Sequence, residues 1–457
     1  MKKIFFLFLV TLLSTLTASA YDAEIDGIYY NFDYETRKAK VTSGISEYTG
    51  SVNIPETVTY NGVNYNVTSI GNAAFYYCSD LTSITIANSV TEIGDSAFWF
   101  CSNLTSITIP KGVTEIRSST FFSCSSLTSV TIPNNVTSIG KKAFQKCSSL
   151  TSVEIPNSVT SIADYAFYSC SSLTSVTIPN SVTSMGRNVF RNCYGLTSIN
   201  IGNSVTSIGE EAFEHCTSLK SITIGNSVTS IGGQAFYDCP SLISITIPNS
   251  VTLIEEEAFC NCSSLTSLTI GSGVTEIGSS AFKKCVDLTE VYCYAENVPS
   301  TNSKAFAESN IENATLYVPE VSVSAYQSTE PWSGFGTIKN LSGETPVIPE
   351  TPKCATPTIN YEGGKLSFIC ETEGVEFHYN LNLTYSDNGT GDDVTVPQTH
   401  YVTIAVYATK DGYDQSETAY KDIAVGGSTA KKGDVNEDGT VNGTDIQEVI
   451  NIIVNAE

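Results

Sequence analysis

Residues 93–115 and 116–138 read IGDSAFWFCSNLTSITIPKGVTE and IRSSTFFSCSSLTSVTIPNNVTS, so the chain repeats itself after 23 residues. The same pattern runs through ten consecutive copies over residues 70–300, half of the 457-residue chain. In every copy a phenylalanine is followed three positions later by a cysteine, and three further on by a leucine. A fixed period of this length is the signature of a repeat fold in which each copy forms one structural unit.

Each copy has the pattern expected for one coil of a solenoid. In the first copy Leu81, Ile84 and Ile86 alternate with polar residues, which predicts a strand with one buried face. Phe75 and Cys78 show helical spacing and are expected to point inward from a short turn. One coil cannot bury its apolar edge alone, whereas stacked coils share a continuous core. At ~4.8 Å per rung, ten coils span about 50 Å.

The repeat resembles the BspA-like leucine-rich repeats of bacterial surface proteins, over roughly residues 25–340. Its motif is L-x-x-I-x-I-P-x-x-V-x-x-I-G-x-x-A-F-x-x-C, and the matching residues include Leu104, Ile107, Ile109, Pro110, Val113, Ile116, Ala97, Phe98 and Cys101. The resemblance implies a leucine-rich-repeat solenoid whose 23-residue units each contain a β-strand and a short turn or helix. It also implies an adhesin or another surface binding protein.

The repeat is predicted to be capped at both ends, because terminal coils would otherwise expose their core. Asn61-Gly62 lies between alternating apolar residues and predicts a hairpin with a two-residue turn. At the other end we expect a last strand at residues 316–318, with Trp332 and Phe335 covering the open core. The predicted segments are a signal peptide (1–20), an N-terminal cap (21–69), the repeats (70–300), a C-terminal cap (301–340), a proline-rich linker (341–353), a small β-sandwich (354–425), a second linker (426–432) and a calcium-binding segment (433–457).

The first twenty residues have the features of a secretory signal. Lys2 and Lys3 precede an apolar run from Ile4 to Leu16, and small residues follow at 18–20. No later stretch approaches 18 apolar residues, so we expect a secreted or surface-displayed protein without a transmembrane anchor. The net charge of −24 argues against a nucleic-acid partner. Only three histidines occur, far apart in the sequence, which argues against a multi-histidine metal site or a histidine-based triad.

Ten of the fourteen cysteines occupy one repeat position. Disulfides, metal ligands and buried thiols are the alternatives for this column. Side chains that run parallel along a stack point past each other and do not converge on a metal, so buried free thiols are favoured. Cys293 takes an isoleucine position and is expected in the core, whereas Cys260 takes a turn position and is expected to be exposed. Cys354 and Cys370 lie outside the repeat and are candidates for a disulfide.

Two surfaces of the coils are candidates for binding. Ser83 and Thr85 begin two outward-facing columns of hydroxyl side chains, which serve either strand propensity and solubility or weak contacts to a repetitive partner. The turn varies more. Its first three copies carry five aromatic residues that form a candidate ligand-binding stripe, suited to sugar stacking or to a protein hot spot. Packing over the coil edge is the alternative for some of these rings, which are Tyr76, Tyr77, Trp99, Phe100 and Phe122.

The C-terminal segment contains a calcium-loop pattern. Oxygen-bearing residues at alternating loop positions converge on one hard cation, and calcium takes six to eight oxygens. The predicted ligands are Asp434, Asn436, Asp438, Thr440 and Asp445. The segment resembles one half of a dockerin, a module that binds cohesin-type partners. Dockerins usually carry two such loops, and this chain carries one.

The sequence therefore predicts a secreted or cell-surface binding protein, or adhesin, that recognises host or glycan-bearing ligands through the solenoid. The alternative is a non-catalytic component of an extracellular polysaccharide-handling assembly, tethered through the dockerin-like tail to a cohesin-like partner. An enzyme is not expected. The acidic clusters at 210–211 and 255–257 fall on solvated turns without a predicted pocket, whereas glycoside hydrolysis needs paired carboxylates facing one cleft.

Overall fold

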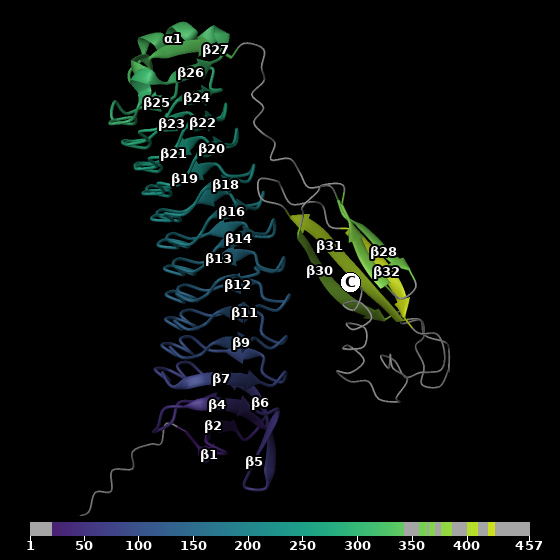
Figure 1. Ribbon diagram of the computed structural model, residues 1–457. Helices are drawn as coiled ribbons and strands as arrows, with labels where there is room; N and C mark the ends of the chain where they lie inside the picture. The colour runs from purple at the N-terminus through teal and green to yellow at the C-terminus, as the bar shows by residue number, and fades with distance from the viewer. Residues whose placement is uncertain are drawn as a thin grey trace, which may run out of the picture. The chain divides into compact units, whose positions relative to one another are not determined.

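The computed structural model describes residues 21–341, 356–362, 365–370, 376–385, 400–409 and 419–425. The chain divides into two compact units, residues 1–343 and 344–457, and each is described by itself. The first unit contains the predicted solenoid, and Figure 1 shows its coils stacked one above another between two caps. The predicted leucine-rich-repeat solenoid is confirmed.

The first side of each coil contributes a strand to a long parallel ladder. Within the repeats, paired strands lie in register 23 residues apart, so that Ser175 lies opposite Ser198 and Val176 opposite Ile199. One coil has no named strand and joins by a bridge between Ser152 and Ser175. The strands in order are β4 (Gly50–Ile54), β7 (Leu81–Ile86), β9 (Ser106–Thr108), β11 (Ser129–Thr131), β14 (Ser175–Ile178), β16 (Ser198–Ile201), β18 (Ser221–Thr223), β20 (Ser244–Ile247), β22 (Ser267–Ile270), β24 (Glu290–Cys293), β26 (Thr315–Val318) and β27 (Thr337–Asn340).

The second side carries a ladder of two-residue strands, which are also parallel and in register. They are β8 (Glu92–Ile93), β10 (Glu115–Ile116), β12 (Ser138–Ile139), β13 (Ser161–Ile162), β15 (Ser184–Met185), β17 (Ser207–Ile208), β19 (Ser230–Ile231), β21 (Leu253–Ile254), β23 (Glu276–Ile277) and β25 (Ser300–Thr301). Because this ladder and the Phe stack both continue past residue 300, the coil pattern extends into the segment predicted as the C-terminal cap.

The third side, here called the turn edge, consists of tight turns. Two residues in each repeat adopt left-handed backbone conformation, as Ala73 (φ 53°) and Tyr77 (φ 60°) do in the first copy. This conformation lets alternate N–H groups point along the stack, so that Phe75 N donates to Ala97 O and Tyr77 N to Trp99 O. The turns of adjacent coils are therefore tied together by backbone hydrogen bonds.

Besides columns of leucine, valine and isoleucine, the core contains a column of phenylalanines and a column of cysteines. Parallel phenylalanine rings stack along the solenoid with centroids 5.0–5.5 Å apart, from Phe75 to Phe282, and Phe306 extends the stack. Beside them each repeat cysteine is buried, and from Cys101 onward its Sγ donates to a phenylalanine carbonyl of the preceding coil, as from Cys170 to Phe144 O (3.2 Å). The thiol thus satisfies a backbone acceptor inside the core while filling apolar space.

The predictions for the solenoid cysteines are confirmed with one exception. All ten repeat cysteines and Cys293 are buried free thiols. Burial raises the pKa of these thiols, to about 12 for Cys193 and well above the usual value for Cys170. The prediction for Cys260 is wrong, because this side chain is only 5% exposed and lies against its neighbours on the turn edge.

The N-terminal cap extends the second ladder with a mixed sheet in the order β1-β2-β3-β6-β5, and β8 pairs with β6. Its hairpin is confirmed, since Tyr60 pairs with Val63 across Asn61 (φ 51°) and Gly62 (φ 75°). Positive φ at both central residues is the two-residue turn that Asn-Gly favours. The cap strands are β1 (Ala23–Ile25), β2 (Ile28–Asp33), β3 (Lys38–Thr42), β5 (Thr57–Tyr60) and β6 (Val63–Ile70).

The C-terminal cap closes the core with aromatic rings, as predicted. Trp332 is fully buried, Phe335 is nearly so, and both contact Phe306 edge-on at 5.4 Å. The strand predicted as the last one, β26, is followed by a further rung, β27. The short helical elements of this cap are η1 (Ile311–Asn313), η2 (Glu320–Ser322), α1 (Val323–Ser328) and η3 (Trp332–Gly334).

The described part of the second unit consists of five antiparallel strands in two groups. One group is a pair and the other a three-stranded meander. The elements are β28 (Thr358–Glu362), β29 (Lys365–Ile369), β30 (Glu376–Tyr385), β31 (His400–Thr409) and β32 (Ala419–Val425). The β-sandwich arrangement stays a prediction.

Candidate binding surface

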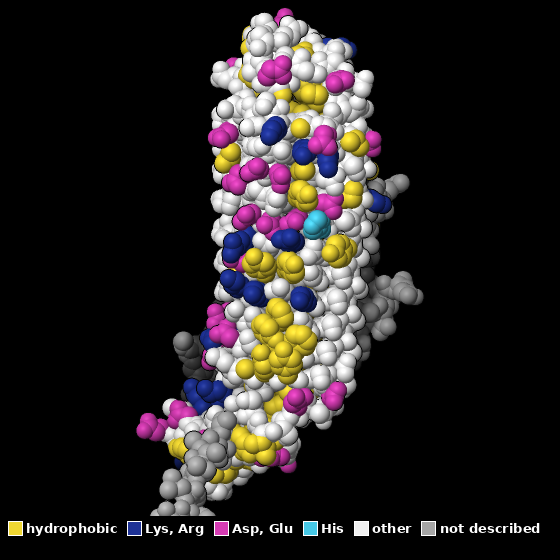
Figure 2. Space-filling model, turned by 90° about the vertical axis from the view of Figure 1, so that its left-hand side faces the viewer, with side chains coloured by type: hydrophobic (Ala, Val, Ile, Leu, Met, Phe, Trp, Pro, Cys, Tyr) yellow, Lys and Arg dark blue, Asp and Glu magenta, His cyan; other side chains and the backbone are white. Residues whose placement is uncertain are grey.

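The five predicted aromatic residues come together on the turn edge of the first three coils and are here called the aromatic patch. Tyr76, Tyr77 and Phe100 are 44%, 47% and 37% exposed, and Trp99 is half-buried. Phe122 is 8% exposed, so packing is the better description of this ring. Figure 2 shows hydrophobic side chains gathered on this edge in the N-terminal half of the stack. Exposed apolar clusters of this kind are uncommon away from interaction sites.

The rings of the patch stack on one another from coil to coil. Tyr77 and Phe100 lie 4.9 Å apart and nearly parallel, and Trp99 lies 3.8 Å from Phe122. Tyr76 stacks on Trp99 at 6.0 Å. Neighbouring rings therefore cover part of each other's faces, most closely where Trp99 lies on Phe122. Because a sugar ring stacks on an aromatic face, this arrangement favours a protein-type hot spot over a sugar platform.

The left-handed backbone at Tyr77 and Phe100 carries no functional information by itself. Bulky residues seldom adopt positive φ, and isolated cases often mark strained functional sites. Here Ser123 (φ 56°) and Lys146 (φ 62°) occupy the same turn position in the next two coils with the same conformation. The conformation is thus a property of the coil.

The coil next to the patch carries three lysines, Lys141, Lys142 and Lys146. Lys146 Nζ lies 5.9 Å from the centre of the Phe122 ring, and Lys142 Nζ lies 5.9 Å from that of Tyr165. Within residues 21–341 none of the three ammonium groups lies within ion-pair distance of a carboxylate. The patch is therefore bordered by cations in a strongly acidic chain. The sequence analysis overlooked this feature, although the repeat register places the three lysines on the coil that follows Phe122.

Further along the turn edge, acidic and basic side chains pair with one another. Arg191 contacts Glu211 and also Glu214, whose Oε2 lies 3.0 Å from Arg191 Nε. His215 lies between two carboxylates, with Nδ1 2.9 Å from Asp238 and Nε2 3.2 Å from Glu214. Burial, followed by the neighbouring Glu211, raises the pKa of Glu214 to about 7, and Arg191 opposes this shift. The only histidine of the solenoid is therefore held by contacts to two carboxylates.

The described residues contain no cluster of three or more His, Cys, Asp or Glu side chains with metal-binding geometry. The hydroxyl columns are exposed over the N-terminal coils, as at Ser83 and Thr85. Near the C-terminal cap they become covered, and Thr269 is 8% exposed. The columns hence offer a shorter open surface than the sequence predicts.

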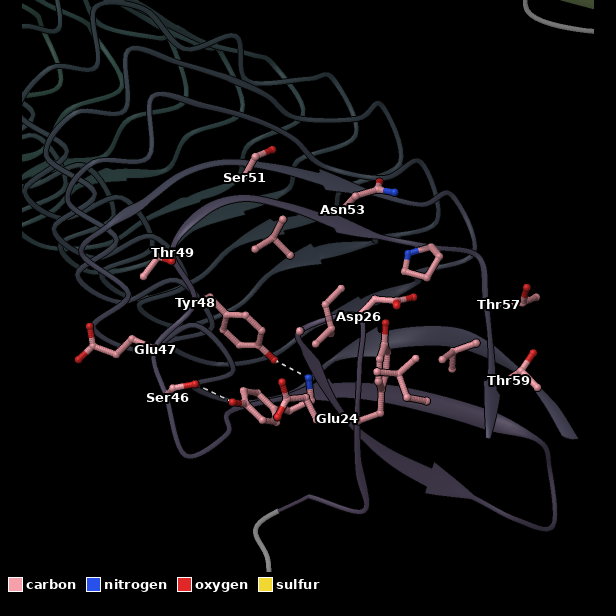
Figure 3. A pocket seen from close by; sticks show the side chains of 18 residues that line it. Glu24, Asp26, Ser46, Glu47, Tyr48, Thr49, Ser51, Asn53, Thr57 and Thr59 are labelled. Atoms are coloured by element: carbon pink, nitrogen blue, oxygen red, sulfur yellow. Dashed lines mark hydrogen bonds between the residues drawn. The ribbon is translucent and has the colours of Figure 1, made fainter. Parts of the chain in front are cut away.

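A cleft of about 820 Å³ lies beside the N-terminal cap, and the sequence analysis did not predict it. Figure 3 shows it between β4, the β1–β2 turn and β5. Its charged lining residues are the exposed acids Glu24, Asp26 and Glu47.

The family model described as the BspA type leucine-rich repeat region (6 copies) matches residues 68–197 and 184–312, more than half of the chain. The chain belongs to the BspA-type leucine-rich repeat family. Its turn edge, with the aromatic patch, is thus an edge of BspA-type coils, and the predicted family resemblance is confirmed for the repeat region.

Solved structures similar to this BspA-type protein are also leucine-rich repeat proteins. A leucine-rich cell surface protein from Faecalibacterium prausnitzii A2-165 is 28% identical, with 72% of this chain and 97% of that chain covered and a TM-score of 0.40. A leucine-rich repeat protein from Bacteroides ovatus ATCC 8483 is also 28% identical, with coverages of 62% and 99% and a TM-score of 0.29. A comparison with curated proteins found no match.

Several predictions for this BspA-type protein lie outside the described residues. They concern the signal peptide, Cys354 and the calcium ligands Asp434, Asn436, Asp438, Thr440 and Asp445. The calcium site and the Cys354–Cys370 disulfide therefore stay predictions. Within the described residues, no helix combines the length and the hydropathy needed to cross a bilayer.

Proposed function

We propose that this BspA-type protein is an extracellular binding protein or adhesin that contacts its ligand through the aromatic patch. The observation that carries the proposal is the group of Tyr76, Tyr77 and Phe100, three rings each more than a third exposed on two neighbouring coils. Elsewhere the outward columns present mainly small hydroxyl side chains, which give little binding energy. Membership of a repeat family found among surface proteins supports a non-catalytic binding role.

The ligand favoured by this surface is a protein epitope, including the polypeptide part of a glycoprotein. Ring edges carry partial positive charge, and the neighbouring Lys141, Lys142 and Lys146 add full positive charges. A partner with an apolar centre and an acidic border would complement both. Stacked rings are also pre-ordered, so little side-chain entropy is lost on binding.

The experiment measures binding of the purified protein to immobilised extracellular glycoproteins, each in native and deglycosylated form. The variant Tyr77→Ser/Trp99→Ser/Phe100→Ser should lose binding to the ligand that the wild type captures. The matched control is Tyr194→Ser/Ile243→Ser/Val286→Ser, which removes three side chains of about 50% exposure elsewhere on the solenoid. Equal loss in both variants, or retention in the patch variant, would refute the proposal. Binding that disappears on deglycosylation would identify a glycan as the ligand.

A second role is proposed on the sequence motif at Asp434–Asp445. The loop would bind calcium and tether the protein to a cohesin-like partner in a polysaccharide-handling assembly. Calcium-dependent capture by a cohesin module, lost in Asp434→Ala, is the expected result. Capture that does not depend on calcium would contradict this role.

A further inference from the structure

The first ladder ends at an open strand edge. β4 pairs with β7 on one side, and within residues 21–341 no strand pairs with its other side. The N-terminal cap continues the second ladder instead, through the pairing of β6 with β8. The cap thus covers the core but leaves the edge of β4 without a neighbouring strand.

The backbone groups on this open edge belong to Ser51 and Asn53. Ile54 O accepts a hydrogen bond from Ala87 N, so the backbone of Ile54 faces the β7 side. N–H and C=O groups alternate in direction along a strand, so Val52 faces the same way. Ser51 and Asn53 therefore direct their N–H and C=O groups away from β7, which is toward the cleft.

The cleft of about 820 Å³ runs along this edge, and Ser51, Val52 and Asn53 are among its lining residues. Figure 3 shows Ser51 and Asn53 on β4 on one side, Asp26 facing them, and Thr57 and Thr59 on β5 beyond. The eighteen lining residues include Glu24, Asp26 and Glu47 but no lysine or arginine. The cleft is therefore negatively charged, and one of its walls is the open edge of β4.

The edge of β4 carries only part of the usual protection of an exposed strand, namely a bulge between Gly50 and Ser51 and Pro55 directly after the strand. Natural edge strands are commonly blocked by lysine, proline or a covering segment. β4 reads GSVNI, and its two outward side chains, Ser51 and Asn53, are small, polar and exposed. Between the bulge and Pro55, the edge at Ser51–Asn53 contains no lysine, proline or covering strand, so this stretch is open to pairing.

We propose that β4 binds an extended basic peptide of a partner protein, which adds to the first ladder as a further strand. Main-chain hydrogen bonds to Ser51 and Asn53 would supply affinity, as in other strand-addition complexes. Glu24, Asp26 and Glu47 select lysine- or arginine-bearing peptides. A strand as long as β4 spans roughly 16 Å, the length of about five peptide residues. A second copy of this chain fits less well, because two acidic clefts would repel each other.

In the test, the peptide acetyl-(Lys-Val)₃-amide is titrated into the purified protein, and calorimetry measures its binding. Three comparison peptides are used. One is unmethylated (Glu-Val)₃, and the other two are (Lys-Val)₃ peptides N-methylated at every second residue, either at the lysines or at the valines. We expect saturable binding of the lysine peptide alone. In one of the two methylated registers affinity should fall roughly tenfold or more, because that register loses the main-chain donors.

The protein variants separate backbone pairing from side-chain contact. Asn53→Pro removes one outward N–H and should weaken binding roughly tenfold, whereas the matched control Asn53→Ala should stay within about twofold. Proline is tolerated at an edge position whose N–H does not serve the ladder, and unchanged unfolding midpoints of both variants verify the fold. Asp26→Asn should weaken binding and reduce its dependence on salt.

Four results would overturn the proposal: no binding of the lysine peptide, equal binding of both methylated registers and the parent, unchanged affinity in Asn53→Pro, or a concentration-dependent dimer that Asn53→Pro abolishes. The last result would assign the edge to a second copy of the chain. Because the cleft and the aromatic patch lie on different elements, the failure of either proposal leaves the other standing.

Discussion

Replacing one ring in the middle of the phenylalanine stack should destabilise the solenoid strongly. Phe167 is fully buried and stacks between Phe144 and Phe190, with centroids 5.3 and 5.4 Å away and interplanar angles of 6° and 2°. Phe167→Ala would leave a ring-sized cavity bounded by these two rings. The turn around it is tied by backbone hydrogen bonds to both neighbouring coils, which limits collapse into the space.

The expected loss in the free energy of unfolding is about 4 kcal/mol. Truncation of a buried phenylalanine costs about 3–5 kcal/mol, and the loss of two ring partners places Phe167 above the lower end of that range. Because each coil contacts only its neighbours, this loss weakens the coupling between the two halves of the stack. Unfolding then becomes less cooperative, so the denaturant m-value should fall together with the unfolding midpoint.

Guanidinium unfolding followed by circular dichroism measures both quantities. The control is Thr177→Ala, which removes an exposed hydroxyl column residue and should change stability by less than about 0.5 kcal/mol. If Phe167→Ala and Thr177→Ala unfold at the same midpoint, the stacked rings do not hold the coils together and the account of the core fails.

Three further predictions concern the thiols, the acidic network and the tail. Buried Cys170 and its repeat equivalents, whose thiol pKa is raised by burial, should resist alkylation in the native protein and react only on unfolding, and rapid native labelling would contradict their burial. Because the folded-state pKa of Glu214 is about 7 against about 4.3 in the unfolded chain, its contribution to stability is present at low pH and is lost as pH rises through about 7. Glu214→Gln should therefore flatten the pH profile of the unfolding midpoint between about pH 5 and 8, and parallel profiles would refute this. Calorimetry should detect calcium uptake that Asp434→Ala abolishes and the control Asp411→Ala retains, and identical isotherms would exclude the predicted loop.

The period of the sequence was sufficient to predict the stack, because a 23-residue repeat leaves each coil only its neighbours to pack against. Two local features were also predictable from residue type. Asn61-Gly62 favours a two-residue hairpin turn, and Trp332 is a large apolar residue suited to covering the open core. Phe306 was overlooked because it follows Phe282 by 24 residues, one more than the period. Side-chain burial on the turn edge was harder to predict from the sequence. Cys260 was expected to be exposed, but its side chain is buried.

The functional surface was predicted as a set of residues but not as a geometry. Sequence position placed the five rings on adjacent coils, yet only coordinates reveal that Trp99 lies on Phe122 and that Phe122 is buried. Repeat patterns also carry no information on how a ladder ends. The open edge of β4 became visible only through the pairing of its neighbours.

Tryptophan fluorescence tests the aromatic patch most directly. The chain has two tryptophans, of which Trp332 is fully buried and Trp99 lies half-exposed in the patch, so quenching by acrylamide reports on Trp99. Saturation with the ligand captured by the wild type should protect Trp99 from acrylamide, in proportion to the bound fraction. Full binding of that ligand with unchanged quenching of Trp99 would contradict the proposal that the patch is the contact surface.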